Sequence, residues 1–233
     1  MTGRPLLLVT RPVAEAGRTA AAAEAAGFDT RLAPLFHIEP LNWAVPETLP
    51  DALLFTSARA PELAAPRLYA CPVFAVGAHT AAAARAAGYQ VAAEGNADGS
   101  AILAQAAESG VRTILHLGGA DTAPVEVPEG LRLVRVPVYA ARPVERLPQA
   151  ALQDLSAGHV FATLLFSARA AQRFRLLLEQ AGLAVSGQRL VALSPAVARA
   201  AGAGWAETVV AQSPTIERAL VAARSLWQGM AHG

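Results

Sequence analysis

The sequence predicts an α/β protein with two lobes, each built around a parallel β-sheet. Short apolar stretches rich in Val and Leu alternate with Ala-rich stretches of helical character, which is typical of βαβ units. The same strand-to-helix turn occurs twice, as FTSARA at 55–60 and LFSARA at 165–170. The 233 residues are enough for two domains of about 100 residues each.

The first βαβ unit is the clearest one along the chain. Leu6–Thr10 is predicted as a strand, Ala14–Ala26 as a helix that Gly27 follows in a C-cap position, and Asp29–Leu35 as the next strand. Helices are expected between the later strands. These further strands are predicted at Ala52–Phe55, Val73–Val76, Gln90–Ala93, Thr113–Leu117, Arg132–Val138, Val160–Phe166, Gln188–Leu193 and Thr208–Val210.

The repeated turn belongs to a longer internal similarity. Ser57 and Ser167 are 110 positions apart, and each follows an apolar strand and precedes Ala-Arg-Ala. Two copies at so long a period indicate two lobes of one architecture rather than a solenoid. The similar segments downstream of the turn are 73–91 with 189–207, and 96–106 with 210–220.

Prolines mark two places where the chain can cross between the lobes. Pro34 and Pro40 bracket the first crossing, and Pro137, Pro143 and Pro148 mark the second. A chain that leaves one lobe and later returns to it has its second lobe inserted into the first. The predicted domains are 1–35 with 143–233 (lobe one) and 36–142 (lobe two with its linker strands).

Charge excludes several classes of protein. The net charge is +1, from 19 cationic and 18 acidic residues, and no basic run is present, so we expect no nucleic-acid partner. Every one of these cations is arginine. The absence of lysine excludes a Schiff-base lysine, a pyridoxal-phosphate enzyme and the lysine of a phosphate-binding P-loop.

The sequence predicts neither a membrane protein nor an exported one. Although 54% of the residues are hydrophobic, no apolar run approaches the roughly 20 residues of a spanning helix. The apolar stretch Leu6–Thr10 is too short for a signal peptide and lacks a cleavage site. Cys71 is the single cysteine and cannot form an internal disulfide, which fits a reducing compartment. We therefore expect a cytoplasmic protein.

Small or hydroxyl-bearing residues follow six of the predicted strands. Ligands of open parallel sheets bind beyond the carboxyl ends of the strands, where helix N-termini offer unpaired N–H groups. Each Ser or Thr can also be a helix N-cap, and the two roles are compatible. Together the turns predict an anion-binding site. They are Thr10-Arg11-Pro12, Thr56-Ser57-Ala58-Arg59, Val76-Gly77-Ala78-His79-Thr80, Leu117-Gly118-Gly119, Phe166-Ser167-Ala168-Arg169 and Leu193-Ser194-Pro195.

Other catalytic signals are weak. The five histidines lack metal-ligand spacing and no Cys, Asp or Glu cluster supplements them, so no metal site is predicted. There is no GxSxG motif, and GAGWAE at 202–207 lacks the third glycine and the preceding strand of a dinucleotide-binding fingerprint. Tyr139, which directly follows the predicted strand Arg132–Val138, could donate a proton into a cleft between the lobes or simply pack.

An ordered set of motifs resembles the uroporphyrinogen-III synthase family. The set covers nearly the whole chain in the order that the family has. Its members are LVTRP at 8–12, LFTSARA at 54–60, VFAVGAHTA at 73–81, VPVY at 136–139, LFSARA at 165–170 and QSPTIERAL at 212–220.

This resemblance implies a fold and a reaction. The implied fold has two flavodoxin-like lobes joined by a two-strand linker, with the second lobe inserted into the first. The implied reaction belongs to tetrapyrrole, and hence haem, biosynthesis: a lyase closes hydroxymethylbilane with inversion of ring D, giving uroporphyrinogen III and water. The resemblance implies no cofactor and no metal. We expect a monomer that receives its substrate from hydroxymethylbilane synthase.

The resemblance also implies the site residues. Tyr139 matches the tyrosine that assists loss of the substrate hydroxyl as water. The substrate carries many carboxylates on a flexible chain, so backbone N–H groups and arginines can hold it in one curled conformation. The implied substrate-binding residues are Arg11, Ser57, Arg59, Gly77, Thr80, Gly118 and Ser167.

Three segments depart from the family's pattern. Ser194–Val197 lacks the usual hydroxyl donors, and residues 118–122 lack the usual arginines. The stretch Ala60–Pro72 is short, which predicts a trimmed helix in lobe two. Because a fold does not fix a function, the alternative is a non-catalytic two-lobed binding protein for a small polyanionic ligand.

Overall fold

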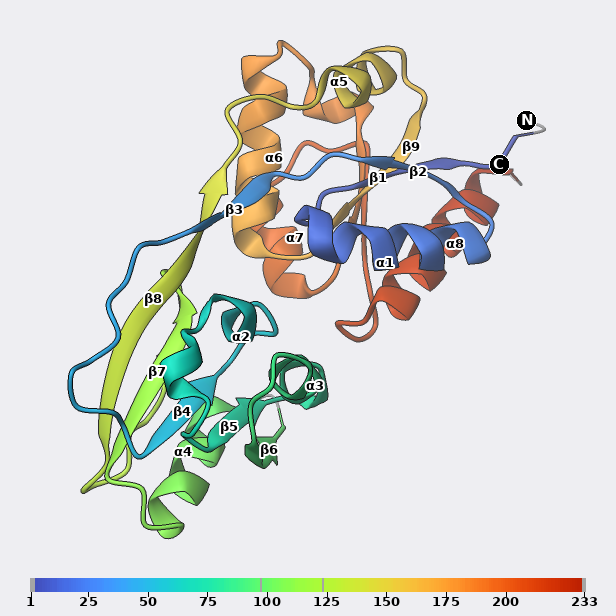
Figure 1. The fold of residues 1–233 in the computed structure, drawn as a ribbon. Helices are drawn as coiled ribbons and strands as arrows, with labels where there is room; N and C mark the ends of the chain where they lie inside the picture. Colours follow the sequence, from blue (N-terminus) through green and yellow to red (C-terminus); the bar gives the residue numbers. More distant parts are fainter. Residues whose placement is uncertain (1–2, 97, 123, 232–233) are drawn as a thin grey trace. The chain divides into compact units, whose positions relative to one another are not determined.

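Two separate, mainly parallel β-sheets organise the chain (Figure 1). The computed structural model describes residues 3–96, 98–122 and 124–231. The chain divides into two compact units: unit 1 is Met1–His37 with Arg142–Gly233, and unit 2 is Ile38–Ala141. The predicted α/β class with two parallel sheets is therefore confirmed. All ten predicted strands are present within the described residues, with ends that differ by a few residues.

The sheet of unit 1 has its most buried strand in the middle. All six residues of the central strand, VFATLL, are buried. This is expected where helices cover both faces of a parallel sheet. The strand order is β11-β10-β9-β1-β2, and all the neighbours are parallel. The strands are β1 (Leu6–Val9), β2 (Asp29–Leu32), β9 (Val160–Leu165), β10 (Arg189–Ala192) and β11 (Glu207–Val210).

Helices cover both faces of this first sheet and form two hydrophobic cores. On one face α1 and α8 lie side by side, and their buried alanines allow a close approach to the strands (Figure 1). On the other face α5, α6 and α7 pack around Phe174, which is fully buried. The helices are α1 (Val13–Ala25), α5 (Gln149–Ser156), α6 (Ala168–Gln180), α7 (Pro195–Ala201), α8 (Ile216–Ala231) and the short 3-10 helix η2 (Val185–Gly187).

The sheet of unit 2 includes one strand that the sequence pattern did not predict. Phe36–Pro40 forms β3, whose residues are half-buried or exposed, so it lacks the apolar run that indicates a strand. It lies beside β8 in the order β3-β8-β7-β4-β5-β6. Both β3 and β8 continue across the division between the units along the chain. The strands are β3, β4 (Ala52–Phe55), β5 (Val73–Val76), β6 (Val91–Gly95), β7 (Thr113–Gly119) and β8 (Arg132–Pro143).

Helices also cover both faces of the second sheet. On one face α2 and α3 pack around the buried Phe55 and Leu68, and on the other face α4 packs through Ile102 and Leu103. The shortened helix predicted in lobe two is observed, because α2 has only four residues. The helices are α2 (Ala60–Leu63), the 3-10 helix η1 (Pro66–Leu68), α3 (Ala78–Ala86) and α4 (Gly99–Glu108).

The repeated turn follows equivalent strands in the two sheets. FTSARA follows β4, and LFSARA follows β9. Let β4 and β9 each count as the first strand of their sheet. Five neighbouring strands then lie in the same order in both sheets: third, second, first, fourth, fifth. In unit 1 the fourth and fifth places belong to β1 and β2, which come first along the chain. The internal sequence similarity therefore reflects a strand order that is shared by the two sheets.

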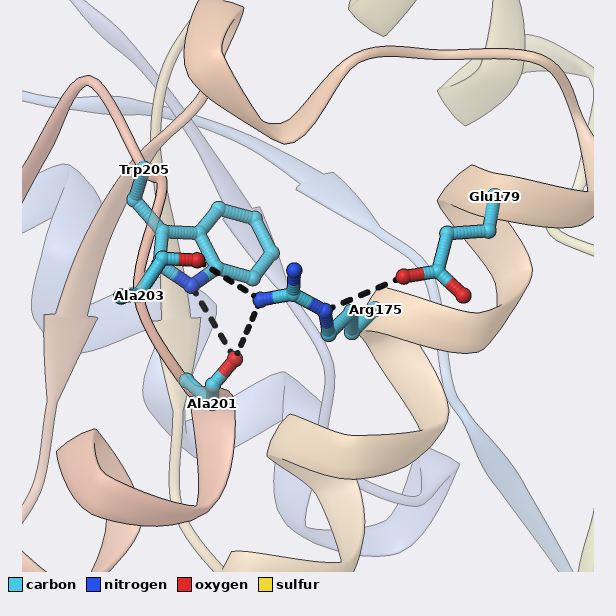
Figure 2. A network of polar contacts seen from close by, with 5 residues as sticks. All are labelled: Arg175, Glu179, Ala201, Ala203 and Trp205. Carbon is cyan, nitrogen blue, oxygen red and sulfur yellow. Dashed lines mark hydrogen bonds and ion pairs between the residues drawn. The ribbon is translucent and has the colours of Figure 1, made fainter.

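Arg175 of α6 forms hydrogen bonds with the end of α7 (Figure 2). The last carbonyls of a helix have no partner within the helix. Nη1 of Arg175 donates to the carbonyl oxygens of Ala201 and Ala203, at 3.0 and 2.9 Å, and Nε donates to Glu179 at 3.1 Å. The indole of Trp205 also donates to Ala201, at 3.2 Å. These bonds fix α7, whose first residue follows the Ser194 turn.

Replacing Arg175 with Met is expected to lower the midpoint of thermal unfolding by about 2–6 °C. Methionine keeps the aliphatic stem but removes charged donors worth about 1–2 kcal/mol in this partly exposed place. Arg85→Met provides the control, because Arg85 forms an exposed ion pair with Glu94 at 3.5 Å, and such pairs contribute little to stability. Equal midpoints for the two variants would show that the Arg175 bonds do not stabilise the fold.

At Thr163, by contrast, a substitution is expected to raise the stability of the fold. Thr163 is fully buried in β9 between Leu8 of β1 and Leu190 of β10, and its hydroxyl has no hydrogen-bond partner within the described part of the chain. A buried hydroxyl without a partner destabilises the fold, so Thr163→Val is expected to raise the unfolding midpoint by about 2–4 °C.

A second buried threonine of unit 1 is the matched control for Thr163→Val. The hydroxyl of Thr10 donates to the carbonyl of Leu164 at 2.6 Å, so Thr10→Val should lower the midpoint. A fall in both variants would contradict the assignment of Thr163 as unpaired.

Candidate functional site

Four of the predicted site residues lie at the points where the strand order reverses in the two sheets. In unit 2 the chain runs from β4 outward to β6 and then returns to the other side of β4 as β7. The equivalent neighbours in unit 1 are β9 and β1. Such reversals are the usual ligand sites of open parallel sheets, because the loops at the carboxyl ends diverge there. Ser57 and Gly118 lie at the first reversal, and Ser167 and Arg11 lie at the second.

The turn after β4 contains Ser57 and Arg59. The hydroxyl of Ser57 accepts from the backbone N–H of Arg59 at 3.3 Å, and the N-cap position of α2 belongs to Arg59. The interpretation of Ser57 as a helix N-cap is therefore wrong. Ser57 and Arg59 are both half-buried, so the turn remains accessible to a ligand.

His116 of β7 contacts this turn. Its Nε2 lies 2.9 Å from Oγ1 of Thr56, and the side chain is only 3% exposed. Burial, followed by the charge of Arg135, lowers the pKa of His116 to about 4. The imidazole is therefore neutral at neutral pH.

Gly118 leaves room for the His116 ring. A Cβ at position 118 would lie 2.9 Å from Nε2 of His116. Gly118 lies inside β7, which continues to Gly119, and the chain then runs to β8 without a helix in the described residues. The prediction that the Gly118 turn precedes a helix is thus wrong. Gly118 therefore leaves room for the contact between His116 and Thr56 and does not precede a helix.

The turn after β5 begins α3. Gly77 is its N-cap residue with φ +83°, a conformation that favours glycine, and its N–H donates to the carbonyl of Gly95 at 2.8 Å. Thr80 lies in the first turn of α3 and is 5% exposed. The side chain of Thr80 therefore belongs to the buried side of the helix.

Tyr139 lies on β8 beside Gly119 of β7. A Cβ at position 119 would lie 2.9 Å from Cε2 and 3.2 Å from the hydroxyl of Tyr139, so the ring rests on the glycine. The strand register shifts between Gly118 and Gly119, and such irregularities redirect side chains near functional sites. Tyr139 is half-buried, and its hydroxyl forms no hydrogen bond with any residue that the structure describes.

The turns of unit 1 include two serine N-caps. Ser167 accepts from the N–H of Ala170 at 3.1 Å and caps α6, and Ser194 accepts from Val197 at 3.4 Å and caps α7. Both caps agree with the interpretation of these serines from the sequence. Arg11 follows β1, and its guanidinium lies 4.9 Å from the centre of the Phe166 ring.

The pairing of Thr56 with His116 was not predicted from the sequence. Its signal is the single histidine in the apolar strand TILHL, because a buried imidazole needs a hydrogen-bond partner. Among the described residues no group of three or more His, Cys, Asp or Glu side chains could hold a metal ion. No helix in the same part of the chain has the length and apolar character needed to cross a bilayer.

The fold and the site define a class of protein: a two-unit α/β protein whose sheets present hydroxyl, guanidinium and N–H groups at their strand-order reversals. The family model described as "Uroporphyrinogen-III synthase HemD" matches residues 17–221. The chain belongs to the uroporphyrinogen-III synthase family. It is accordingly a cyclising lyase of tetrapyrrole biosynthesis, and its substrate is hydroxymethylbilane.

Solved structures support the fold. The chain is similar to a uroporphyrinogen-III synthetase from Helicobacter pylori, with a TM-score of 0.64, 17% identity and coverage of 96% of this chain and 99% of the other. It is also similar to a mutant uroporphyrinogen III synthase from Thermus thermophilus, with a TM-score of 0.51, 17% identity and coverage of 97% and 99%. No curated protein sequence matches the chain.

Proposed function

We propose that this chain closes hydroxymethylbilane to uroporphyrinogen III with Tyr139 as the proton donor. The family match over residues 17–221 supports the reaction. The half-buried hydroxyl of Tyr139, which has no partner among the described residues, supports the assignment of the donor. A phenol without a hydrogen-bond partner among the described residues can donate to a substrate oxygen.

The reaction balances with this single donor. The C–O bond of the hydroxymethyl group breaks as Tyr139 gives its proton to the departing oxygen, so that water leaves. Ring D then forms a bond at its substituted position, and the spiro intermediate rearranges to the inverted macrocycle. Ring closure releases a proton, which restores the phenol. No redox cofactor is needed, because the closure eliminates water and involves no net oxidation or reduction.

The carboxylates of the substrate are bound near the strand-order reversals of both sheets. Arg11 and Arg59 supply charge, and Ser57, Gly118 and Ser167 lie in or beside turns with backbone N–H groups. Gly77 and Thr80 act by shaping the start of α3, because Thr80 is buried. The protein's main contribution is to hold one curled conformation, since the free substrate closes without inversion.

Three further properties belong to this proposal. The enzyme works as a monomer in the cytoplasm, which fits a single buried thiol, Cys71. It receives hydroxymethylbilane from hydroxymethylbilane synthase, because the substrate closes spontaneously in water. Its domains are 1–35 with 143–233, and 36–142. Gel filtration of the protein alone and with hydroxymethylbilane synthase tests the first and second properties.

A coupled assay tests the function directly. Purified protein is added to hydroxymethylbilane synthase and its substrate, and the isomer of the oxidised product is determined by chromatography. We expect the type III isomer at a rate proportional to enzyme concentration. Formation of type I alone, at the uncatalysed rate, would contradict the proposal and favour a binding protein for a polyanionic ligand.

A further inference from the structure

We propose that His116 is a positioning residue that fixes the substrate-binding turn Thr56–Arg59 through its contact with the Thr56 hydroxyl. This inference rests on the proposed function of that turn. His116 itself is only 3% exposed. It acts on binding by holding Thr56, the residue that joins β4 to Ser57.

The contact lies where the chain leaves the sheet. Leu54 pairs with His116, and Phe55 pairs with Leu117. Thr56 is therefore the first residue after the paired part of β4. The distance of 2.9 Å between Oγ1 of Thr56 and Nε2 of His116 is that of a hydrogen bond. This bond ties the start of the turn to the neighbouring strand β7.

The surroundings of His116 fit this role. Its ring is placed on a strand of otherwise apolar buried residues, where an imidazole is costly unless it forms a hydrogen bond. Gly118 provides the space for the ring, as any Cβ there would meet Nε2. Arg135 is the charged group whose field reaches the ring, and it disfavours the imidazolium. A neutral imidazole can serve Thr56 as donor or acceptor.

Two hydrogen bonds from backbone N–H groups join residues of the turn to one another. Within it, the N–H of Arg59 is bonded to the Ser57 hydroxyl at 3.3 Å, and the N–H of Ala60 to the Ser57 carbonyl at 3.2 Å. Both bonds are internal to the turn, whereas the Thr56 contact joins the first residue of the turn to the neighbouring strand β7. A turn that is ordered before binding loses less entropy when it binds a carboxylate.

Steady-state kinetics with His116→Leu, Thr56→Val and the double variant test the proposal. Loss of the bond is expected to raise KM about fivefold to tenfold in each single variant, with kcat within about twofold of wild type, because Tyr139 is on a different strand. The double variant should show no further rise, since both changes remove the same bond. His116→Gln and Thr56→Ser, which retain hydrogen-bonding groups, should restore KM to within about twofold of wild type.

Controls separate positioning from general destabilisation. Ile114→Val shortens a buried side chain of the same strand two positions earlier, and it should lower thermal stability without changing KM. An unchanged KM in Thr56→Val, multiplied effects in the double variant, or an equal rise in Ile114→Val would overturn the inference. If His116→Leu does not fold, the comparison of Thr56→Val with Thr56→Ser still decides. Failure of the wild-type chain to form the type III isomer would instead refute the proposed function.

Discussion

The variant Tyr139→Phe is expected to lower kcat by about 100-fold or more with little change in KM. The substitution removes the proton donor for the departing hydroxyl, and general acid catalysis typically contributes about 10²–10⁴-fold. The ring can still rest on Gly119, so the unfolding midpoint should stay within about 2 °C of wild type. The measurement is the initial rate of type III product under saturating substrate.

Tyr69→Phe is the matched control for this prediction. Tyr69 is 46% exposed in the same unit, and its loss of a hydroxyl should leave kcat unchanged. A second variant, Gly119→Val, adds a side chain where the Tyr139 ring lies and should reduce kcat by displacing the phenol. Near wild-type turnover of Tyr139→Phe would remove Tyr139 from the mechanism.

The second large effect concerns stability in acid. The pKa of His116 is about 4 in the folded chain and about 6.5 in the unfolded chain. Above pH 6.5 the residue is neutral in both states and has no pH-dependent effect. As the pH falls from 6.5 to 4, the unfolded chain binds a proton that the folded chain does not, so His116 lowers the free energy of unfolding by up to about 3 kcal/mol.

Urea unfolding of wild type and His116→Gln at several pH values isolates this contribution. Other groups titrate in both proteins, including Asp51, whose pKa is lowered by N–H bonds from Thr113 and Arg112. The wild type should therefore lose about 3 kcal/mol more than the variant between pH 7 and pH 4. Parallel curves for the two proteins would show that the imidazole is not held neutral.

The sheet architecture could be predicted because its signals are local and repeated. Buried strands such as Ala52–Phe55 are continuous apolar runs, and the second copy of the turn at 165–170 indicated a second sheet. The strand β3 could not be predicted in this way. Its partly exposed residues owe their strand conformation to the neighbour β8, which is distant in sequence.

The two copies of the repeated turn show why the site was harder to predict than the fold. In α6 the N–H of Ala171 donates to the carbonyl of Ser167 at 3.0 Å and starts the helix. The equivalent residue of the other copy is Pro61, which has no N–H, so Ser57 instead receives a bond from Ala60. A single proline thus explains why one copy of the turn caps a helix and the other is an irregular turn. The histidine in TILHL indicates that a hydrogen-bond partner is needed, but the identity of that partner, Thr56, depends on the strand order and is not encoded in a local pattern.

The duplicated strand order places similar turns at the ends of two sheets, but only one of the two equivalent positions carries a phenol. Tyr139 is on β8, the fifth strand of its sheet, whereas the fifth strand of unit 1, β2, is followed by Ala33-Pro34-Leu35, which carry no acid or base. With Tyr139 as the donor, the hydroxymethyl end of the substrate belongs with unit 2. Two units with the same strand order can in this way distinguish the two ends of a linear substrate.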